Sequence, residues 1–388
     1  MRRLSHPFWT LVWIRVVFWA GTALTLLWAP LHGTAIPADR AYGGIGDLLF
    51  RTFEHWDAQW FLHVAKDGYN PTSAAFFPLY PALLHALAWV FRSYLVAGTL
   101  LSLATAGLAA WALAEIARPL FGDGGARDAV LYLALFPTAF VFTALYSDGL
   151  FLALSAASFL AALRGRTWSA GVAGGLAVAA RLVGLALLPA LLYLLWPRRG
   201  QRLWRPLPLV LLPAAVGFYS LYLHYATGDW LAWRHAQVGW QRETPFLGPL
   251  GGLWWSIQAG GHGGLSLLRH LPDGMGAPGG FTPTERLAFW NAFSLVLLVV
   301  ACWLTWVAWR RLGPAFGLYA AATLVVVLAA PSRGFPLVSL PRFLMDCFPI
   351  VLALVALTRR RGRDATLVTL AALSAVAGVA FAHTIWIA

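Results

Sequence analysis

Charge is scarce in this sequence. Only 11% of the 388 residues are charged, whereas 60% are hydrophobic, and Lys66 is the only lysine. A soluble globular chain carries about 25% charged residues, so the composition excludes an ordinary soluble domain. In place of the missing charge there are repeated apolar runs of roughly 20 residues, which are typical of helices that cross a lipid bilayer.

Cysteine is scarce as well. The two cysteines, Cys302 and Cys347, both lie in apolar runs, so we expect neither a disulfide framework nor a cysteine-based metal cluster. His55 and His63 are eight residues apart, which is not a known pattern of metal ligands. We therefore expect no cofactor and no metal, and a divalent metal near these histidines is the alternative.

Eleven apolar runs are suited to spanning a membrane, although several are short for a hydrocarbon core of about 30 Å. They are residues 9–29, 96–117, 128–144, 147–163, 168–180, 184–196, 207–226, 287–309, 314–330, 343–357 and 365–386. The runs 168–180 and 184–196 could instead form one broken helix, and 76–92 could be a twelfth span. The first run is too long for the apolar part of a signal peptide, so we expect a retained helix. We predict one all-α polytopic membrane domain over residues 1–388 with about eleven transmembrane helices.

Arginine is concentrated in six short loops between these runs. Together the six loops hold 16 arginines and only three acidic residues, whereas the other loops hold 11 basic and 10 acidic residues. The six loops carry Arg2/Arg3, Arg118/Arg127, Arg164/Arg166, Arg198/Arg199/Arg202/Arg205, Arg310/Arg311 and Arg359/Arg360/Arg361/Arg363. The positive-inside rule places them in the cytoplasm. The net charge of +13 therefore indicates topology and headgroup contacts, and we expect no nucleic-acid partner.

Two large loops then lie on the outer side, at about 30–95 and 227–286. All six basic loops can be cytoplasmic only if 76–92 does not cross the membrane and if 168–196 crosses it twice. We therefore predict that 76–92, which contains two prolines, is a re-entrant or surface-lying helix. Such a helix is tolerated at membrane depth where protein or a water-filled cavity surrounds it.

The second outer loop contains the stretch Leu253–Leu271, which predicts a short amphipathic helix in the membrane interface. The C-terminus lies outside in this topology. We expect a multi-pass protein of the plasma (inner) membrane whose functional side chains face the extracytoplasmic side.

The densest cluster of functional groups lies in the first outer loop, from Glu54 to Tyr69. As a helix, this segment places an apolar stripe beside polar groups, and Gly68 would end it. Asp57 would lie at the boundary between water and lipid, where it could reach the polar head of a ligand whose tail stays in lipid. The alternative is an interfacial helix with aromatic anchors.

The run WDAQWFLHVAKDGY at 56–69, followed by AFFPLYP at 75–81, resembles the signature of the PIG-V type mannosyltransferase family. That family comprises the second GPI mannosyltransferase of eukaryotes and its prokaryotic relatives. Three further pieces resemble family motifs in the same order, namely Ala144–Phe151, Ala179–Gly184 and Pro341–Leu344. The likeness extends from about residue 50 to 350, and the loop 227–286 is unmatched.

The sequence departs from the family pattern at three places. His55 replaces an arginine, Asp148 replaces a glutamate, and Asn70-Pro71-Thr72-Ser73 stands where a glutamate often follows Gly-Tyr. These departures bear on the identity of the donor and the acceptor more than on the type of reaction.

The resemblance implies a GT-C-like fold and an inverting glycosyltransferase. Such an enzyme takes a sugar, mannose by the name of the family, from a polyprenyl-phosphate carrier on the extracytoplasmic side. The implied partners are that donor, membrane lipids, and a lipid, glycan or protein acceptor. By its place in the motif, Asp57 is the expected base that deprotonates the acceptor hydroxyl, a contribution of roughly 10²–10⁴-fold.

Other motif residues are expected to bind substrate. Arg181 and Arg342 are the expected contacts to the carrier phosphate, because arginine suits forked contact with phosphate; the alternative is a snorkelling interface arginine. Asp148 could hold the acceptor or orient Asp57, or it could only cap a helix. The remaining expected substrate contacts are His55, Trp56, Tyr69 and Tyr80.

The sequence is also compatible with two other functions. A transporter or flippase of polyprenyl-linked sugars would share the basic loops and the polar cluster. Transporters usually bury ionisable residues near the bilayer midplane, whereas here these residues gather at helix ends, which favours an enzyme. A non-catalytic assembly subunit would tolerate the loss of Asp57, so its presence argues against that function.

Overall fold

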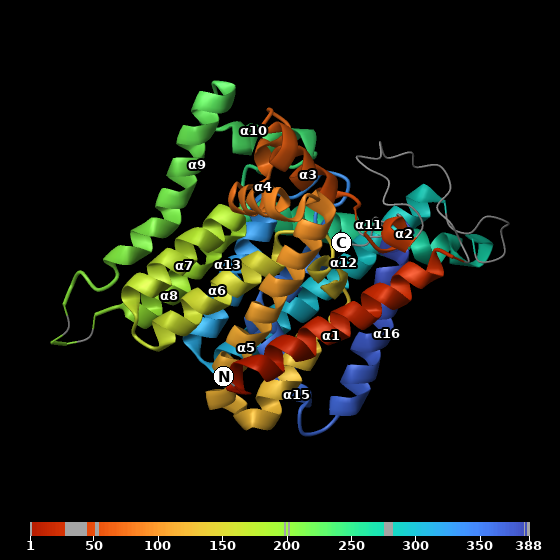
Figure 1. Ribbon diagram of the computed structural model, residues 1–388. Helices are drawn as coiled ribbons and strands as arrows, with labels where there is room; N and C mark the ends of the chain where they lie inside the picture. Colours follow the sequence, from red (N-terminus) through yellow and green to blue (C-terminus); the bar gives the residue numbers. More distant parts are fainter. Residues whose placement is uncertain are drawn as a thin grey trace.

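The computed structural model describes residues 2–27, 45–50, 54–197, 199–200, 202–274, 282–383 and 385. Within these residues the chain is helical, with one isolated antiparallel bridge between Arg242 and Ser332 and no strand. Parts of both predicted outer loops, 30–44, 51–53 and 275–281, lie outside the described residues. The helices pack around a continuous core of buried apolar side chains (Figure 1).

The helices follow one another along the chain, and Figure 1 labels most of the α-helices. They are α1 Arg2–Thr25, α2 Ile45–Phe50, α3 Asp57–Asp67, η1 Ser73–Ala75, α4 Leu79–Phe91, α5 Tyr94–Ala134, η2 Ala139–Phe142, α6 Asp148–Leu163, α7 Thr167–Ala180, η3 Leu182–Ala186, α8 Leu187–Leu195, η4 Leu207–Val210, α9 Leu211–Thr227, α10 Ala232–Gly239, α11 Pro249–Gly274, α12 Pro283–Val307, η5 Ala308–Leu312, α13 Pro314–Ala329, α14 Leu340–Asp346, α15 Phe348–Thr358 and α16 Arg363–Ala382.

Five helical segments of the described chain are long and apolar enough to cross a membrane, or six if the bent pair α14–α15 is one span. The five are His6–Thr25, Tyr94–Ala134, Leu207–Thr227, Pro283–Leu312 and Arg363–Ala382. Five further apolar helices are shorter, with 10–17 residues each. The fold is thus that of an all-α membrane protein, as the sequence predicted. The count of about eleven spans and the GT-C-like arrangement stay predictions.

The predicted spans 96–117 and 128–144 have different bounds in the structure. Both belong to α5, which is broken at Gly122, where the backbone has φ 72° and ψ −176°. A positive φ of this kind is easily adopted only by glycine. The second half of α5 ends at Ala134 and not at 144, because Pro137 follows and a residue before proline is disfavoured in the helical conformation.

Two other predicted runs are also broken. The run 343–357 is divided at Cys347 into α14 and α15, which meet at an angle of 79°. Pro349 has no N–H and its ring would clash with the preceding turn, so one straight helix cannot pass through it. The segment 168–196 is divided at Arg181, whose backbone is extended. That second division agrees with the predicted pair of helices.

The six arginine-rich loops gather at one end of the helix bundle, which we call the basic end. Figure 1 shows the N-terminus and the α15–α16 connection at this end. Polar contacts tie four of the six loops to neighbouring parts of this end, namely Arg164 to Glu115 at 2.7 Å, Arg363 to Asp128 at 2.7 Å, Arg359 to the Phe121 carbonyl at 3.2 Å and Arg311 to the Ala356 carbonyl at 3.0 Å. This arrangement agrees with the charge pattern. The leaflet that the basic end faces stays a prediction.

The opposite end is capped by α3, α4 and α10 (Figure 1). Helix α4 packs against α3 through a hydrogen bond between His85 Nδ1 and the Ala65 carbonyl, 2.6 Å long. Its 13 residues give a length of about 20 Å at 1.5 Å per residue, which is short for a hydrocarbon core of about 30 Å. Other apolar helices of the bundle, such as α7 with 14 residues, are similarly short, so the non-crossing helix in 76–92 stays a prediction.

The segment predicted as a short interfacial helix, Leu253–Leu271, is part of the longer helix α11. Glycines bring α11 into close backbone contact with its neighbours. A Cβ on Gly252 would lie 1.9 Å from the Leu328 carbonyl oxygen, and one on Gly263 would lie 2.3 Å from the Ala288 carbonyl oxygen. Small residues permit such close packing of membrane helices. The helix is therefore packed onto α12 and α13 rather than lying alone in the interface.

Cysteine labelling tests the position of α4. In a chain with Cys302 and Cys347 replaced by alanine, we introduce either Thr72→Cys or Val90→Cys. Thr72 is exposed in the connection before α4, and Val90 is 61% exposed at the end of α4. A membrane-impermeant maleimide should label the two positions from the same side of the membrane. Labelling from opposite sides would contradict a non-crossing α4.

Candidate active site at the end opposite the basic loops

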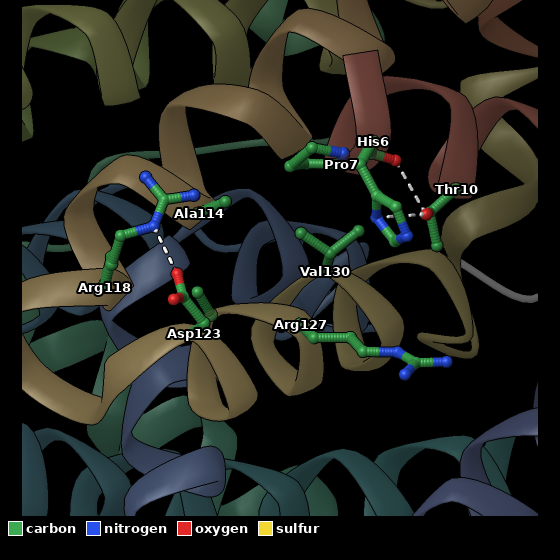
Figure 2. Close-up of a pocket in the computed structure, with 9 residues that line it drawn as sticks. His6, Pro7, Thr10, Ala114, Arg118, Asp123, Arg127 and Val130 are labelled. Atoms are coloured by element: carbon green, nitrogen blue, oxygen red, sulfur yellow. Dashed lines mark hydrogen bonds and ion pairs between the residues drawn. The ribbon is translucent and has the colours of Figure 1, made fainter. Parts of the chain in front are cut away.

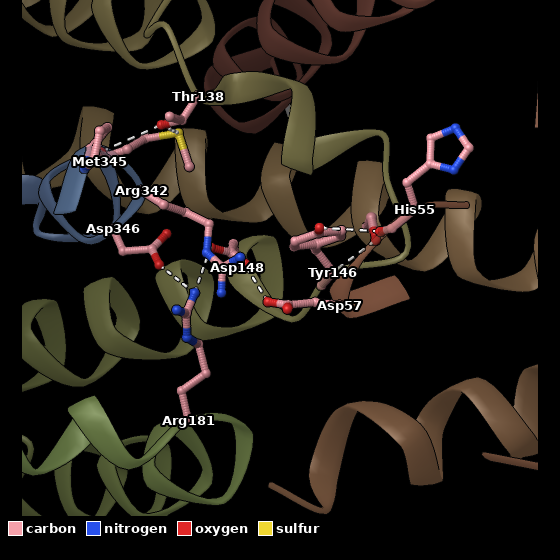
Figure 3. A network of polar contacts seen from close by, with 11 residues as sticks. His55, Asp57, Thr138, Tyr146, Asp148, Arg181, Arg342, Met345 and Asp346 are labelled. Carbon is pink, nitrogen blue, oxygen red and sulfur yellow. Dashed lines mark hydrogen bonds and ion pairs between the residues drawn. The ribbon is translucent and has the colours of Figure 1, made fainter. Parts of the chain in front are cut away.

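Four sequence motifs that are far apart in the chain meet in one network of polar contacts (Figure 3). Asp57 comes from the start of α3, Asp148 from the start of α6, Arg181 from the end of α7 and Arg342 from α14. Helices α6 and α7 run from and to this network, and their other ends meet at the basic loops. The network therefore lies at the end opposite the basic end.

Asp57 is held by its neighbours along the chain and by one arginine. The Arg342 Nη1 atom donates to Asp57 Oδ2 over 2.7 Å. The preceding residue, Trp56, has φ 59° and ψ −117°, a strained conformation for a bulky side chain. The carbonyl oxygen of His55 accepts a 3.2 Å hydrogen bond from the Tyr146 hydroxyl. These contacts fix the position of Asp57, and its side chain remains 25% exposed.

Asp148 and Asp346 are buried carboxylates that share one arginine. Arg181 Nη1 lies 2.5 Å from Asp148 Oδ1 and 2.6 Å from Asp346 Oδ2. Asp148 is 0% exposed, so its charge requires a partner there, because an unpaired buried charge is very costly. The Arg181 guanidinium also lies over the Phe343 ring, 5.1 Å from its centre, which leaves this arginine enclosed.

Arg342 joins the buried pair to Asp57. Its Nε lies 3.1 Å from Asp148 Oδ1, an ion pair that is not aligned as a hydrogen bond. Its guanidinium lies over the ring of Tyr146, 5.1 Å from the centre. Three carboxylates and two guanidinium groups are thus in direct contact in this network.

Arg242 lies near the network and adds a further positive charge there. It belongs to the connection after α10, which pairs with residues 331–333 through the bridge to Ser332. Burial, and then the like charge of Arg342, lower the pKa of Arg242 to about 10, while Asp57 opposes this shift. It is half-buried and has no ion pair or side-chain hydrogen bond among the described residues. It remains charged at neutral pH and is available to an anion.

The side chains of the other residues predicted to contact substrate are not part of the polar network around Asp57. Trp56 is 42% exposed beside Asp57, as a substrate contact requires. The His55 ring points away from the network in Figure 3 and lies 6.0 Å from the Phe381 ring. Burial lowers the pKa of His55, partly offset by a hydrogen bond to the backbone of Ala382, so the ring is neutral at pH 7. Its contribution is therefore through its carbonyl group.

Tyr69 and Tyr80 pack into the protein through their hydroxyl groups. Tyr69 donates to the Phe76 carbonyl over 2.8 Å, and the hydroxyl of Tyr80 lies 3.0 Å from Ser102 Oγ. Tyr80 is completely buried. The geometry therefore favours packing roles for both over the predicted stacking on substrate.

Three members of the site did not emerge from the sequence, namely Asp346, Arg242 and Tyr146 as an anchor of His55. Asp346 is four residues after Arg342, on the same helical face. An acidic residue inside an apolar run is itself a signal of function. Arg242 had no such signal, because it lies in the loop that matches no motif.

Among the described residues no group of three or more His, Cys, Asp or Glu side chains is arranged to hold a metal ion. His63 contacts Asp67 at 3.0 Å and Asn70 at 2.8 Å. His55 is buried and takes no part in these contacts. Comparison with known proteins adds no relative, because no family model matches the chain and no curated protein matches it.

Proposed function

We propose that this protein is a membrane glycosyltransferase. It transfers a sugar, mannose by the motif resemblance, from a polyprenyl-phosphate carrier to an acceptor hydroxyl on the extracytoplasmic side, with inversion at the anomeric carbon. The observation that supports this most is the placement of Asp57. It is the partly exposed carboxylate of a network in which Asp148 and Asp346 are buried.

Asp57 is suited to act as the base. Its Oδ2 is bound by Arg342, which leaves Oδ1 for the acceptor hydroxyl. In the proposed step, the acceptor oxygen attacks the anomeric carbon and its proton moves to Asp57. The bond between that carbon and the phosphate oxygen breaks, and polyprenyl phosphate leaves with the electron pair. The proton then returns to water.

The leaving phosphate gains negative charge, which fixed cations stabilise in the transition state. The sequence predicted Arg181 and Arg342 for this role. Arg181 is occupied by two buried carboxylates, so we assign the phosphate contact to Arg242, with Arg342 as the nearest further cation. Arg181 then acts as a positioning residue that holds Asp148 and, through it, Arg342.

Aromatic side chains beside Asp57 suit a ligand that is part sugar and part isoprenoid. Trp60, one turn after Asp57, stacks on Phe76 with ring centres 5.9 Å apart. Trp240 meets both rings edge-on, at 5.3 and 5.7 Å. Because Trp240 is two residues before Arg242, these ring contacts attach the segment with the proposed phosphate-binding arginine to α3.

The full chain reconstituted in proteoliposomes tests the proposal against the transport alternative. Donors with different sugars on a polyprenyl phosphate are supplied with a membrane extract that contains acceptors. We expect labelled sugar to leave the polyprenyl fraction and enter an acceptor fraction. If the intact donor only moves between leaflets, with no sugar transferred from any donor, the protein is a carrier and the proposal fails.

A further inference from the structure

The basic end contains a pocket between α1 and the break in α5 (Figure 2). Its volume is about 260 Å³. The residues that line it are His6, Pro7, Thr10, Ala114, Arg118, Asp123, Ala126, Arg127 and Val130. It lies at the end opposite Asp57, so it takes no part in the proposed transfer reaction.

Positive charge in the pocket is only partly neutralised. Arg118 is paired with Glu115 and, over 2.8 Å, with Asp123. Arg127 is exposed and has no hydrogen bond or ion pair among the described residues. Figure 2 shows Arg127 and His6 on facing sides of the pocket. The unpaired guanidinium is therefore the group that can accept an anionic ligand from solution or from the membrane surface.

The pocket also has apolar walls and lies beside a surface suited to lipid. Ala114, Ala126 and Val130 form the wall contributed by α5. On α1, Trp9 is 51% exposed and Trp13 is 62% exposed. Exposed tryptophans of this kind are typical of helix surfaces at the level of lipid headgroups. A ligand held here could have its charged group at Arg127 and its apolar part along α1.

We propose that this pocket binds the phosphodiester headgroup of an anionic phospholipid. Basic pockets between membrane helices bind such headgroups, and a guanidinium makes two parallel hydrogen bonds to phosphate oxygens. The bound lipid bridges α1 and the two halves of α5 at Gly122, where the helix is not continuous. The site thus stabilises the break in α5.

Lipid retention by the purified full-length protein tests this assignment. The protein is delipidated in a neutral detergent, incubated with equal amounts of phosphatidylglycerol and phosphatidylcholine, and analysed by native mass spectrometry. We expect one phosphatidylglycerol to be retained in preference to phosphatidylcholine. Arg127→Gln should lower that retention about tenfold, the loss expected for one charge-assisted contact of roughly 1.4 kcal/mol.

Arg361→Gln is the matched control, because Arg361 is an exposed arginine of the same end that does not line the pocket. It should leave retention unchanged. Equal losses in both variants would show adsorption to general surface charge and would overturn the site. A third arm adds inorganic phosphate without lipid and follows thermal unfolding. Arg127-dependent stabilisation by phosphate, without preferential lipid retention, would overturn the lipid assignment in favour of a free anion.

Discussion

Replacing Asp57 by asparagine should lower sugar transfer about 10²–10⁴-fold, the range expected for loss of a positioned general base. The substitution keeps the shape of the side chain and one oxygen for Arg342, so the protein should fold and retain its donor. The loss should therefore fall on the turnover number and not on the Michaelis constant of the donor. The measurement is transfer of labelled sugar at saturating and at limiting donor concentrations.

Asp67→Asn is the matched control for this variant. Asp67 is at the other end of α3, its side chain is 65% exposed, and it contacts His63. Removal of its charge alters the same helix without touching the network around Arg342. We expect near-normal transfer. Full activity of Asp57→Asn, or an equal loss in Asp67→Asn, would contradict the assignment of Asp57 as the base.

Replacing Asp148 by alanine should strongly destabilise the protein. The change leaves Arg181 and Arg342 buried with one carboxylate fewer between them, and breaking a buried ion pair costs about 3–5 kcal/mol. The measurement is the melting temperature of the variant and of the unchanged protein in detergent micelles. Activity should fall as well, because Arg342 would no longer be held in place to bind Asp57.

Asp123→Asn gives the comparison for this effect, because Asp123 also pairs with an arginine but has a side chain that is 90% exposed. Exposed ion pairs contribute about 0–1 kcal/mol, so its melting temperature should change little. If Asp148→Ala were as stable as Asp123→Asn, the buried network would not be an important contribution to the fold, and the positioning role of Arg181 would lose its basis.

Much of the site could be predicted from the sequence. Asp57, Asp148, Arg181 and Arg342 lie in four short motifs separated by up to 285 residues, and the structure brings them together. The distribution of arginine among the loops predicted that all four residues lie at one end of the bundle, because each is at a helix end away from the arginine-rich loops. Motif likeness and topology were independent arguments, and both pointed to one location.

The sequence was less informative about residues whose role depends on tertiary contacts. The role of Arg242 depends on the pairing of residues 241–243 with 331–333, and no local pattern indicates that pairing. The assignment of Arg181 to phosphate likewise could not anticipate Asp346, which occupies the same guanidinium. An arginine at a helix end has the same local signal whether its partner is a ligand or a buried carboxylate.

The predicted ends of the helices were inaccurate for a different reason. Apolar runs indicate which residues avoid water, but proline and glycine decide where a helix stops. The extent of 128–144 was wrong because Pro137 ends the helix early, and 343–357 is bent where Pro349 enters. We predicted a loop between 96–117 and 128–144, whereas in the structure Gly122 is the residue of α5 with non-helical dihedral angles.

The central claim is that the network around Asp57 catalyses inverting transfer from a polyprenyl-phosphate sugar. The most direct measurement follows both products of the purified protein, namely the sugar that enters the acceptor and the polyprenyl phosphate that is released. We predict equal amounts of the two, an anomeric configuration opposite to that of the donor, and loss of both products in Asp57→Asn. Retained configuration, or release of polyprenyl phosphate that does not depend on Asp57, would contradict the account.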